Sequence, residues 1–206
     1  SNSYGGPGWN ESVREAVKYA VSKNVVFVAA KGNENTNTRH FPSDYDANWI
    51  ISVGAVDESD QKSVWCCGQA SNTGNGIDVV APGGRNTANN VYTTSPNPNT
   101  STPNYKTFSG TSAATPHVAG LAALILSEAL DQGRTLHHED VEGIIKASAK
   151  DVNQSTYPGY DDQLGWGRIN AGKALEMMNT PWQLLQQSTT GGSIYSSTDW
   201  YKTQLN

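Results

Sequence analysis

The sequence predicts an α/β fold built on a mostly parallel β-sheet. Strand-like segments come as short, uninterrupted apolar runs, which is typical of strands buried on both faces: 25–30, 49–56 and 77–81. Helix-like segments show apolar residues at helical spacing or apolar residues nearly all round: 10–23, 112–130, 139–149 and 171–178. Alternation of the two kinds of segment favours a parallel sheet with helices packed on it.

The first helix has a clear beginning. Pro7 and Gly8 break the chain before it, and Asn10 is suited to be its N-cap. Apolar residues then recur at helical spacing up to Val21. The strand predicted at 25–30 follows directly, so we expect helix and strand to pack against each other.

The ends of the predicted strands are the places to look for a ligand. Ligands of open α/β sheets bind at the carboxyl ends of the strands. In this chain those ends are 31–34, 57–58 and 82–84. Residues 84–107 are rich in Asn, Thr, Ser and Pro and predict a surface loop with room for short strands.

The helix predicted at 112–130 is apolar nearly all round, which is typical of a helix inside a domain. Pro116 limits where it begins, because proline has no N–H to donate to the carbonyl of Ser112. The helix must therefore begin close to Ser112. A serine there has its hydroxyl and its N–H at the positive end of the helix dipole, which suits a nucleophile beside an oxyanion donor.

Length and composition limit the alternatives. With 206 residues and a net charge of −5, residues 1–178 are expected to form one domain, and the acidic balance disfavours nucleic acid as a partner. No uninterrupted apolar run approaches ~18 residues, so no membrane span is predicted. Residues 179–206 are polar and predict a linker or the start of a C-terminal extension. The sequence opens on Ser1 rather than Met, which is typical of a partial or processed product.

The segment at 110–120, GTSAATPHVAG, resembles the nucleophile motif of the subtilisin-like serine proteases, the subtilases. Further segments resemble the same family in the same order: SYGGPG at 3–8, VVFVAAKGNEN at 25–35, FPSDYDANWIISVGAVD at 41–57, DVVAPGG at 78–84 and GWGRINAGKAL at 165–175. The resemblance covers about residues 1–178. It implies the carboxyl-terminal part of a three-layer α/β/α catalytic domain whose first strands lie upstream of Ser1.

The resemblance also implies roles for single residues. Ser112 resembles the nucleophile, and Asn33 resembles the side-chain donor to the oxyanion. An edge that pairs with an extended substrate is implied for Ser3, Tyr4, Gly5 and Gly6, and the other wall of the primary pocket for Ala29, Ala30, Lys31 and Gly32. His40 resembles the residue at the base of that pocket, although a plain loop histidine is the alternative.

The base and the carboxylate that a serine nucleophile needs are not evident in this sequence. The family's Asp and His segments would lie upstream, in the same chain or in a separate amino-terminal chain that stays bound. His117 lies about 140° around the helix from Ser112, so we expect a packed structural histidine. His137 and His138 are expected at the surface or as capping residues.

The expected function is a serine endopeptidase that cleaves extended polypeptides through an acyl-enzyme and needs no cofactor for its chemistry. This chain alone is expected to be inactive and poorly folded. The alternative is a pseudoprotease or a peptide-binding module without a triad. An extracellular location follows from the resemblance and from the Asn, Ser and Thr content.

Several side chains leave two interpretations open. Lys31 is expected to point to solvent, with a bias of the pocket toward acidic side chains as the alternative. Two free thiols are expected at Cys66 and Cys67, because a ring between adjacent cysteines is strained. Solvated loop carboxylates are expected, with structural calcium ligands as the alternative, at Asp57, Glu58, Asp60, Asp161 and Asp162.

Overall fold

The computed structural model describes residues 1–46, 49–74, 76–85, 90–95 and 104–179. The helices are α1 (Glu11–Ser22), α2 (Thr111–Asp131), α3 (His138–Ser148) and α4 (Ala171–Met178), and each lies where the sequence predicts one. The strands are β1 (Val28–Ala30), β2 (Ile51–Val56), β3 (Val79–Pro82), β4 (Val91–Ser95) and β5 (Asn104–Phe108). The predicted linker at 179–206 lies outside the described residues, apart from Asn179.

The main sheet is parallel, in the order β1-β2-β3, as predicted. Asn2 continues it beyond β1 through a parallel bridge to Ala29. The strand β1 is shorter than the predicted run, because the chain leaves α1 through a left-handed turn at Asn24 (φ 63°). Val25 is consequently 47% exposed.

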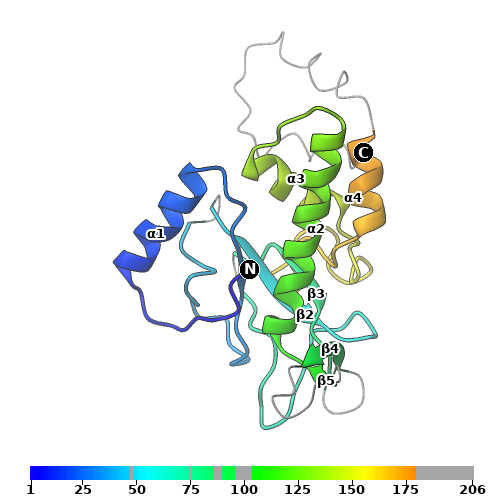
Figure 1. The fold of residues 1–206 in the computed structure, drawn as a ribbon. Coiled ribbons are helices and arrows are strands. Elements are labelled where there is room, and N and C mark those ends of the chain that lie inside the picture. The colour runs from blue at the N-terminus through cyan, green and yellow to red at the C-terminus, as the bar shows by residue number, and fades with distance from the viewer. Residues whose placement is uncertain (47–48, 75, 86–89, 96–103, 180–206) are drawn as a thin grey trace.

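Helices cover the sheet on two sides, so the fold has the predicted three layers (Figure 1). Alternate residues of the strands, such as Val28, Val53 and Val79, share one core cluster with α2, α3 and α4. On the opposite face Ala29 packs with residues of α1. Strand alternation therefore assigns the two faces of the sheet to different helices.

The segment predicted as a surface loop contains a β-hairpin. β4 and β5 pair antiparallel, with Tyr92 opposite Thr107. The rings of Tyr92 and Tyr105 stack with centroids 5.3 Å apart, and both side chains are more than half exposed. Cross-strand aromatic pairs of this kind stabilise a hairpin that has little core to bury.

The helix α2 is only half buried, and the expectation of a helix inside the domain is wrong for one of its faces. Val118 and Ile125 are fully buried against the sheet, whereas Leu124 is 52% and Leu130 is 70% exposed. By length and mean hydropathy α2 is also apolar enough to cross a bilayer, although no single apolar run in it is that long. In this fold it packs on all three parallel strands.

Candidate active site

The N-terminus of α2 lies at the carboxyl end of the sheet. Gly110, the N-cap, has φ 118° and ψ 167°, a backbone conformation that favours glycine. Its N–H donates to the carbonyl of Gly83, which directly follows β3, over 2.9 Å. The helix begins at Thr111, which confirms the prediction from Pro116 that it begins next to Ser112.

Ser112 and Ser3 exchange hydrogen bonds across the site. The Ser112 hydroxyl donates to the Ser3 carbonyl, and the Ser3 hydroxyl donates to the Ser112 carbonyl, both over 3.1 Å. The Ser112 carbonyl is available because Pro116 cannot donate to it. The proline thus creates the acceptor through which Ser3 holds the amino-terminal segment against α2.

The amide of Asn33 is oriented by Thr111. Both the N–H and the hydroxyl of Thr111 donate to Asn33 Oδ1, each over 2.9 Å. A backbone N–H can only donate, so the oxygen of the amide must face Thr111 and the Nδ2 donor is directed elsewhere. Thr111 was not among the predicted site residues, although it directly precedes Ser112 in the motif.

Gly110 brings the two expected oxyanion donors together. A Cβ placed on Gly110 would lie 3.6 Å from the Ser112 nitrogen and 3.7 Å from Asn33 Nδ2. As the second residue of α2, Ser112 has an N–H with no acceptor inside the helix. Two N–H donors therefore lie close to the same point beside Gly110, at the positive end of the helix dipole.

The segment Ser3–Gly5 is an exposed, extended edge fixed at both ends. The Asn2 carbonyl accepts from the Ala30 N–H over 3.0 Å, and Gly6 exchanges backbone hydrogen bonds with Phe41. Ser3, Tyr4 and Gly5 are exposed between these anchors. An edge of this kind offers backbone groups to a second extended chain.

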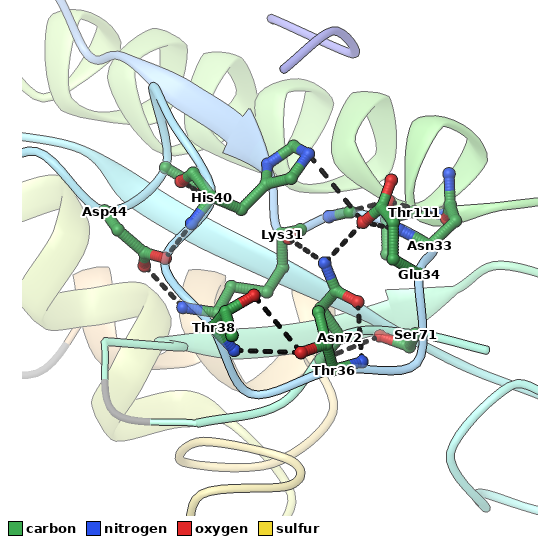
Figure 2. A network of polar contacts seen from close by, with 12 residues as sticks. Lys31, Asn33, Glu34, Thr36, Thr38, His40, Asp44, Ser71, Asn72 and Thr111 are labelled. Atoms are coloured by element: carbon green, nitrogen blue, oxygen red, sulfur yellow. Dashed lines mark hydrogen bonds and ion pairs between the residues drawn. The ribbon is translucent and has the colours of Figure 1, made fainter. Parts of the chain in front are cut away.

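His40 lies between the two segments expected to form the primary pocket. A Cβ on Gly5 would lie 2.3 Å from Cε1 of His40, and a Cβ on Gly32 would lie 2.7 Å from its Cδ2. His40 is 5% exposed, and burial lowers the pKa of its imidazole, with Glu34 acting in the opposite direction. Its Nε2 is 3.9 Å from the Glu34 carboxylate (Figure 2).

Lys31 does not point to solvent, so that expectation is wrong. The side chain is 1% exposed and forms an ion pair with the buried carboxylate of Asp44 (Figure 2). The other oxygen of Asp44 accepts from the His40 N–H over 2.7 Å. A buried ammonium needs a buried partner, and Asp44 supplies one, so Lys31 brings no net charge to the pocket.

The loop that carries Asn33 is fixed by Asn72. Its Nδ2 donates to the Lys31 carbonyl over 3.0 Å and to the Glu34 carboxylate over 2.6 Å, and its Oδ1 accepts from the Thr36 N–H over 3.1 Å (Figure 2). Ala29 and Ala30 are buried strand residues. The wall at 29–32 is therefore rigid backbone with short side chains, apart from the buried Lys31.

The contacts recorded for His40, His117 and His137 are with residues other than Ser112. His117 is exposed rather than packed, because it lies on the uncovered side of α2, and its Nδ1 pairs with the Ala113 carbonyl over 2.8 Å. His137 is the exposed N-cap of α3, as predicted, and Asp140 accepts from its N–H. Among the hydrogen bonds of the described residues, none joins a histidine to Ser112.

The acidic loop residues have partners within the chain. Asp57 accepts from the N–H groups of Ser59 and Gln61, Asp60 pairs with Arg168, and Asp161 accepts from two backbone N–H groups. Within the described ranges no three His, Cys, Asp or Glu side chains converge as a metal site would require. Structural calcium stays an untested alternative. Cys66 and Cys67 are free thiols, as predicted, and both are exposed.

Residues 1–167 match the subtilase family. The chain belongs to this family. Thermitase from Thermoactinomyces vulgaris is 35% identical over 176 residues, which cover 85% of this chain and 53% of thermitase. Subtilisin DY from Bacillus licheniformis is 37% identical over 161 residues, or 76% of this chain and 51% of the subtilisin.

Solved structures agree with the assignment. A lanthipeptide protease superposes with a TM-score of 0.69 and 30% identity over 82% of this chain and 55% of its own. The expected α/β subtilase fold is therefore confirmed. The chain spans about half the length of the curated relatives it matches.

Proposed function

We propose that the protein carrying this chain is a serine endopeptidase with Ser112 as its nucleophile. The observation that carries the proposal is the pair of donors close to Gly110, the Ser112 N–H and the Asn33 amide that Thr111 orients. The family assignment supports the same reaction class. The triad Asp and His are expected from the upstream part of the protein.

The proposed reaction uses the groups of the site in a fixed order. An upstream base removes the proton that the Ser112 hydroxyl now donates to Ser3. The Ser112 oxygen attacks the scissile carbonyl, and the resulting oxyanion accepts from the Ser112 N–H and from Asn33 Nδ2. Collapse releases the amine and leaves an acyl-enzyme, which water hydrolyses.

The substrate proposed for this site is an extended polypeptide with a small side chain before the scissile bond. Its backbone would pair with the exposed edge Ser3–Gly6, where backbone hydrogen bonds supply affinity. The imidazole of His40 takes up the space between Gly5 and Gly32. Little room is then left for a large side chain between these two walls, and no net charge comes from Lys31.

The partner proposed for the chain is the amino-terminal part of the same protease, continuous with it or bound as a separate chain. Supporting this, the relatives are about twice as long as their match to this chain, and one face of α2 is apolar and exposed. An extracellular location is also proposed. Measuring the amount of the protein in the culture medium and in washed cells would test this location.

The decisive test is labelling with a fluorophosphonate, which reacts only with an activated serine. We expect an adduct on Ser112 in the protein with its upstream part, and none in this chain alone. Ser112→Ala in the extended protein is the matched control. If the extended protein remains unlabelled while binding an extended peptide, the endopeptidase proposal fails.

A pseudoprotease is the second candidate, and one observation favours it. The Ser112 hydroxyl donates to a backbone carbonyl, an acceptor that cannot activate it. A peptide-binding module would keep the edge Ser3–Gly6 and lack the base. Peptide binding by calorimetry, without turnover and without fluorophosphonate labelling of the extended protein, would establish this alternative.

A further inference from the structure

A second pocket adjoins the proposed oxyanion donors. It has a volume of about 190 Å³, and Asn33 and Gly110 form part of its wall. Much of the remaining wall is formed by Trp65, Cys66 and Asn90. The pocket thus touches the reacting region directly, and whatever fills it lies beside the Asn33 amide.

Two buried polar atoms in this wall have no protein partner in the described part of the chain. They are Nε1 of Trp65, a residue that is only 9% exposed, and Oδ1 of Asn90. A buried donor or acceptor without a partner costs free energy, about 1–3 kcal/mol. A polar group in the pocket that reached either atom would recover this free energy.

Cys66 brings a thiol to the mouth of the same pocket. It begins a tight turn in which the Gln69 N–H donates to the Cys66 carbonyl over 3.1 Å, and the Trp65 N–H donates to Gln69 over 2.8 Å. Cys67 and Gly68 take left-handed conformations within the turn (φ 62° and 80°). Both thiols are free and exposed, but of the two only Cys66 lines the pocket.

We propose that Cys66 is a site of reversible modification by small-molecule disulfides, and that the mixed disulfide closes the pocket beside Asn33. The Cys66 thiolate attacks one sulfur of the disulfide. A bond forms between Cys66 Sγ and that sulfur, the sulfur–sulfur bond of the reagent breaks, and the other half leaves as a thiolate that takes up a proton. An added thiol reverses the exchange in the same way.

Cys67 differs from Cys66 in two ways. Its pKa is raised by hydrogen bonding with the Cys66 thiol, which makes its own thiolate scarce at neutral pH. It also lies outside the pocket wall. Modification of Cys67 therefore places its adduct in solvent, and the adjacent cysteine serves as an internal control.

The consequence for turnover rests on the proposed peptidase function. A glutathione group on Cys66 would occupy the space next to Asn33 and displace a substrate from its reactive position. Displacements of about 1 Å can lower a rate by about a hundredfold. We expect a loss of about tenfold or more in kcat/KM, restored by dithiothreitol.

The experiment uses the full protein with glutathione disulfide as the probe. The variants Cys66→Ser and Cys67→Ser are each compared with their own unmodified form by intact mass, peptide mapping, tryptophan fluorescence and peptide turnover. In Cys67→Ser we expect an adduct on Cys66, a change in emission from Trp65 and the loss of turnover. In Cys66→Ser we expect emission and turnover to stay within about twofold of the unmodified form.

The outcomes separate this proposal from the peptidase proposal. Equal effects in both variants, or a Cys66 adduct that alters neither emission nor turnover, would overturn the role of Cys66. If the unmodified protein shows no turnover and no fluorophosphonate adduct, the peptidase proposal has failed instead. In that case closure of the pocket is still tested by tryptophan emission, which should change in Cys67→Ser and not in Cys66→Ser. Adding Trp65→Phe shows whether the change comes from Trp65.

Discussion

Thr111 is the residue on which the orientation of Asn33 depends most directly. Two donors of one residue, its N–H and its hydroxyl, hold the amide oxygen of Asn33. The hydroxyl also accepts from the Gly32 N–H over 3.3 Å, so it connects both residues of the oxyanion loop to α2. Thr111 is fully buried, and water cannot replace the hydroxyl at low cost.

Replacing Thr111 by valine should therefore lower kcat more than it raises KM. The lost hydrogen bond is worth about 1 kcal/mol, which corresponds to about a fivefold drop in kcat. Steady-state kinetics on one peptide substrate measure it. Thr111→Ser should restore kcat, because serine keeps the hydroxyl. A fall in thermal stability with unchanged kcat would show that Thr111 is merely structural.

His40 sets the space available before the scissile bond. Replacing it by alanine removes the ring that separates Gly5 from Gly32. The kcat/KM should therefore rise for peptides with a larger residue before the scissile bond. Filling a hydrophobic pocket with one or two more carbons is worth about tenfold or more in kcat/KM. The measurement compares peptides that differ in this residue alone.

His138→Ala is the control, since His138 is partly buried and begins α3, which lies beside the C-terminal half of α2 in Figure 1. It should leave the ratio between large and small residues unchanged. If His40→Ala keeps the preference of the parent protein, the imidazole does not limit the pocket.

Single residues differ in how far the sequence could predict them. Ser112 and the start of its helix followed from Pro116, because a missing donor has only local consequences. Lys31 did not follow, because its partner Asp44 lies 13 residues further on and only the folded loop brings the charges together. Thr111 was missed because nothing in the sequence shows that its hydroxyl reaches Asn33.

At the scale of elements, a buried charge cluster joins α3 to the sheet. Lys146 pairs with Glu142 one turn earlier and with Asp78, which directly precedes β3, over 2.7 Å. Burial is the main cause that raises the pKa of both acids, and that of Glu142 reaches about 7. One ammonium thus faces two carboxyl groups away from water, which favours retention of a proton.

The sign of the pH effect follows from this raised pKa. Between the ordinary pKa of 4.5 and about 7, folded Glu142 holds a proton that the unfolded chain has released. The contribution of protonated Glu142 to the free energy of unfolding is complete below pH 4.5 and is lost as the pH rises toward 7. Replacing Glu142 by glutamine should remove this loss, because the amide never ionises.

Urea unfolding at pH 5 and at pH 8 measures the effect. Between these values the parent protein should lose about 1–3 kcal/mol relative to Glu142→Gln. Glu176→Gln, in the exposed pair of α4 with Lys173, is the control and should follow the parent. Parallel pH profiles of the parent and Glu142→Gln would contradict the protonated cluster.

The sequence predicted elements well where they bury a periodic or continuous apolar pattern. All four helices lie where expected, since Asn10 and Pro116 define the beginnings of two of them. The hairpin β4–β5 was expected only as a loop with room for strands, because most of its residues are exposed and it contains no continuous apolar run. Backbone pairing and one tyrosine stack hold it, and neither has a strong pattern in sequence.

For the whole molecule, the outer face of α2 is the feature that calls for a partner. One side of this helix exposes apolar residues together with the polar His117 and Ser127; the apolar ones are Pro116, Gly120, Ala123, Leu124 and Leu130. The sequence showed a helix apolar all round, but only the fold shows which side this chain leaves uncovered. A face of this length that carries two exposed leucines is typical of an interface.

The proposed occupant is the upstream part of the same protease, because the relatives extend well beyond the matched region. We expect the chain alone to lack a cooperative thermal transition and to bind a hydrophobic dye. Co-expression with the upstream part should restore a single cooperative transition. Calorimetry and dye fluorescence on both preparations measure the difference.

A substitution on the outer face of α2 tests whether this face binds the upstream part. Leu130→Gln should weaken assembly with the upstream part, because a buried amide without a partner costs about 1–3 kcal/mol. Tyr19→Gln on α1 is the matched control: Tyr19 is 67% exposed against 70% for Leu130, and α1 packs on the other face of the sheet. If the chain alone melts cooperatively, or both substitutions leave assembly intact, the outer face of α2 is a free surface and the missing base must reach Ser112 by another route.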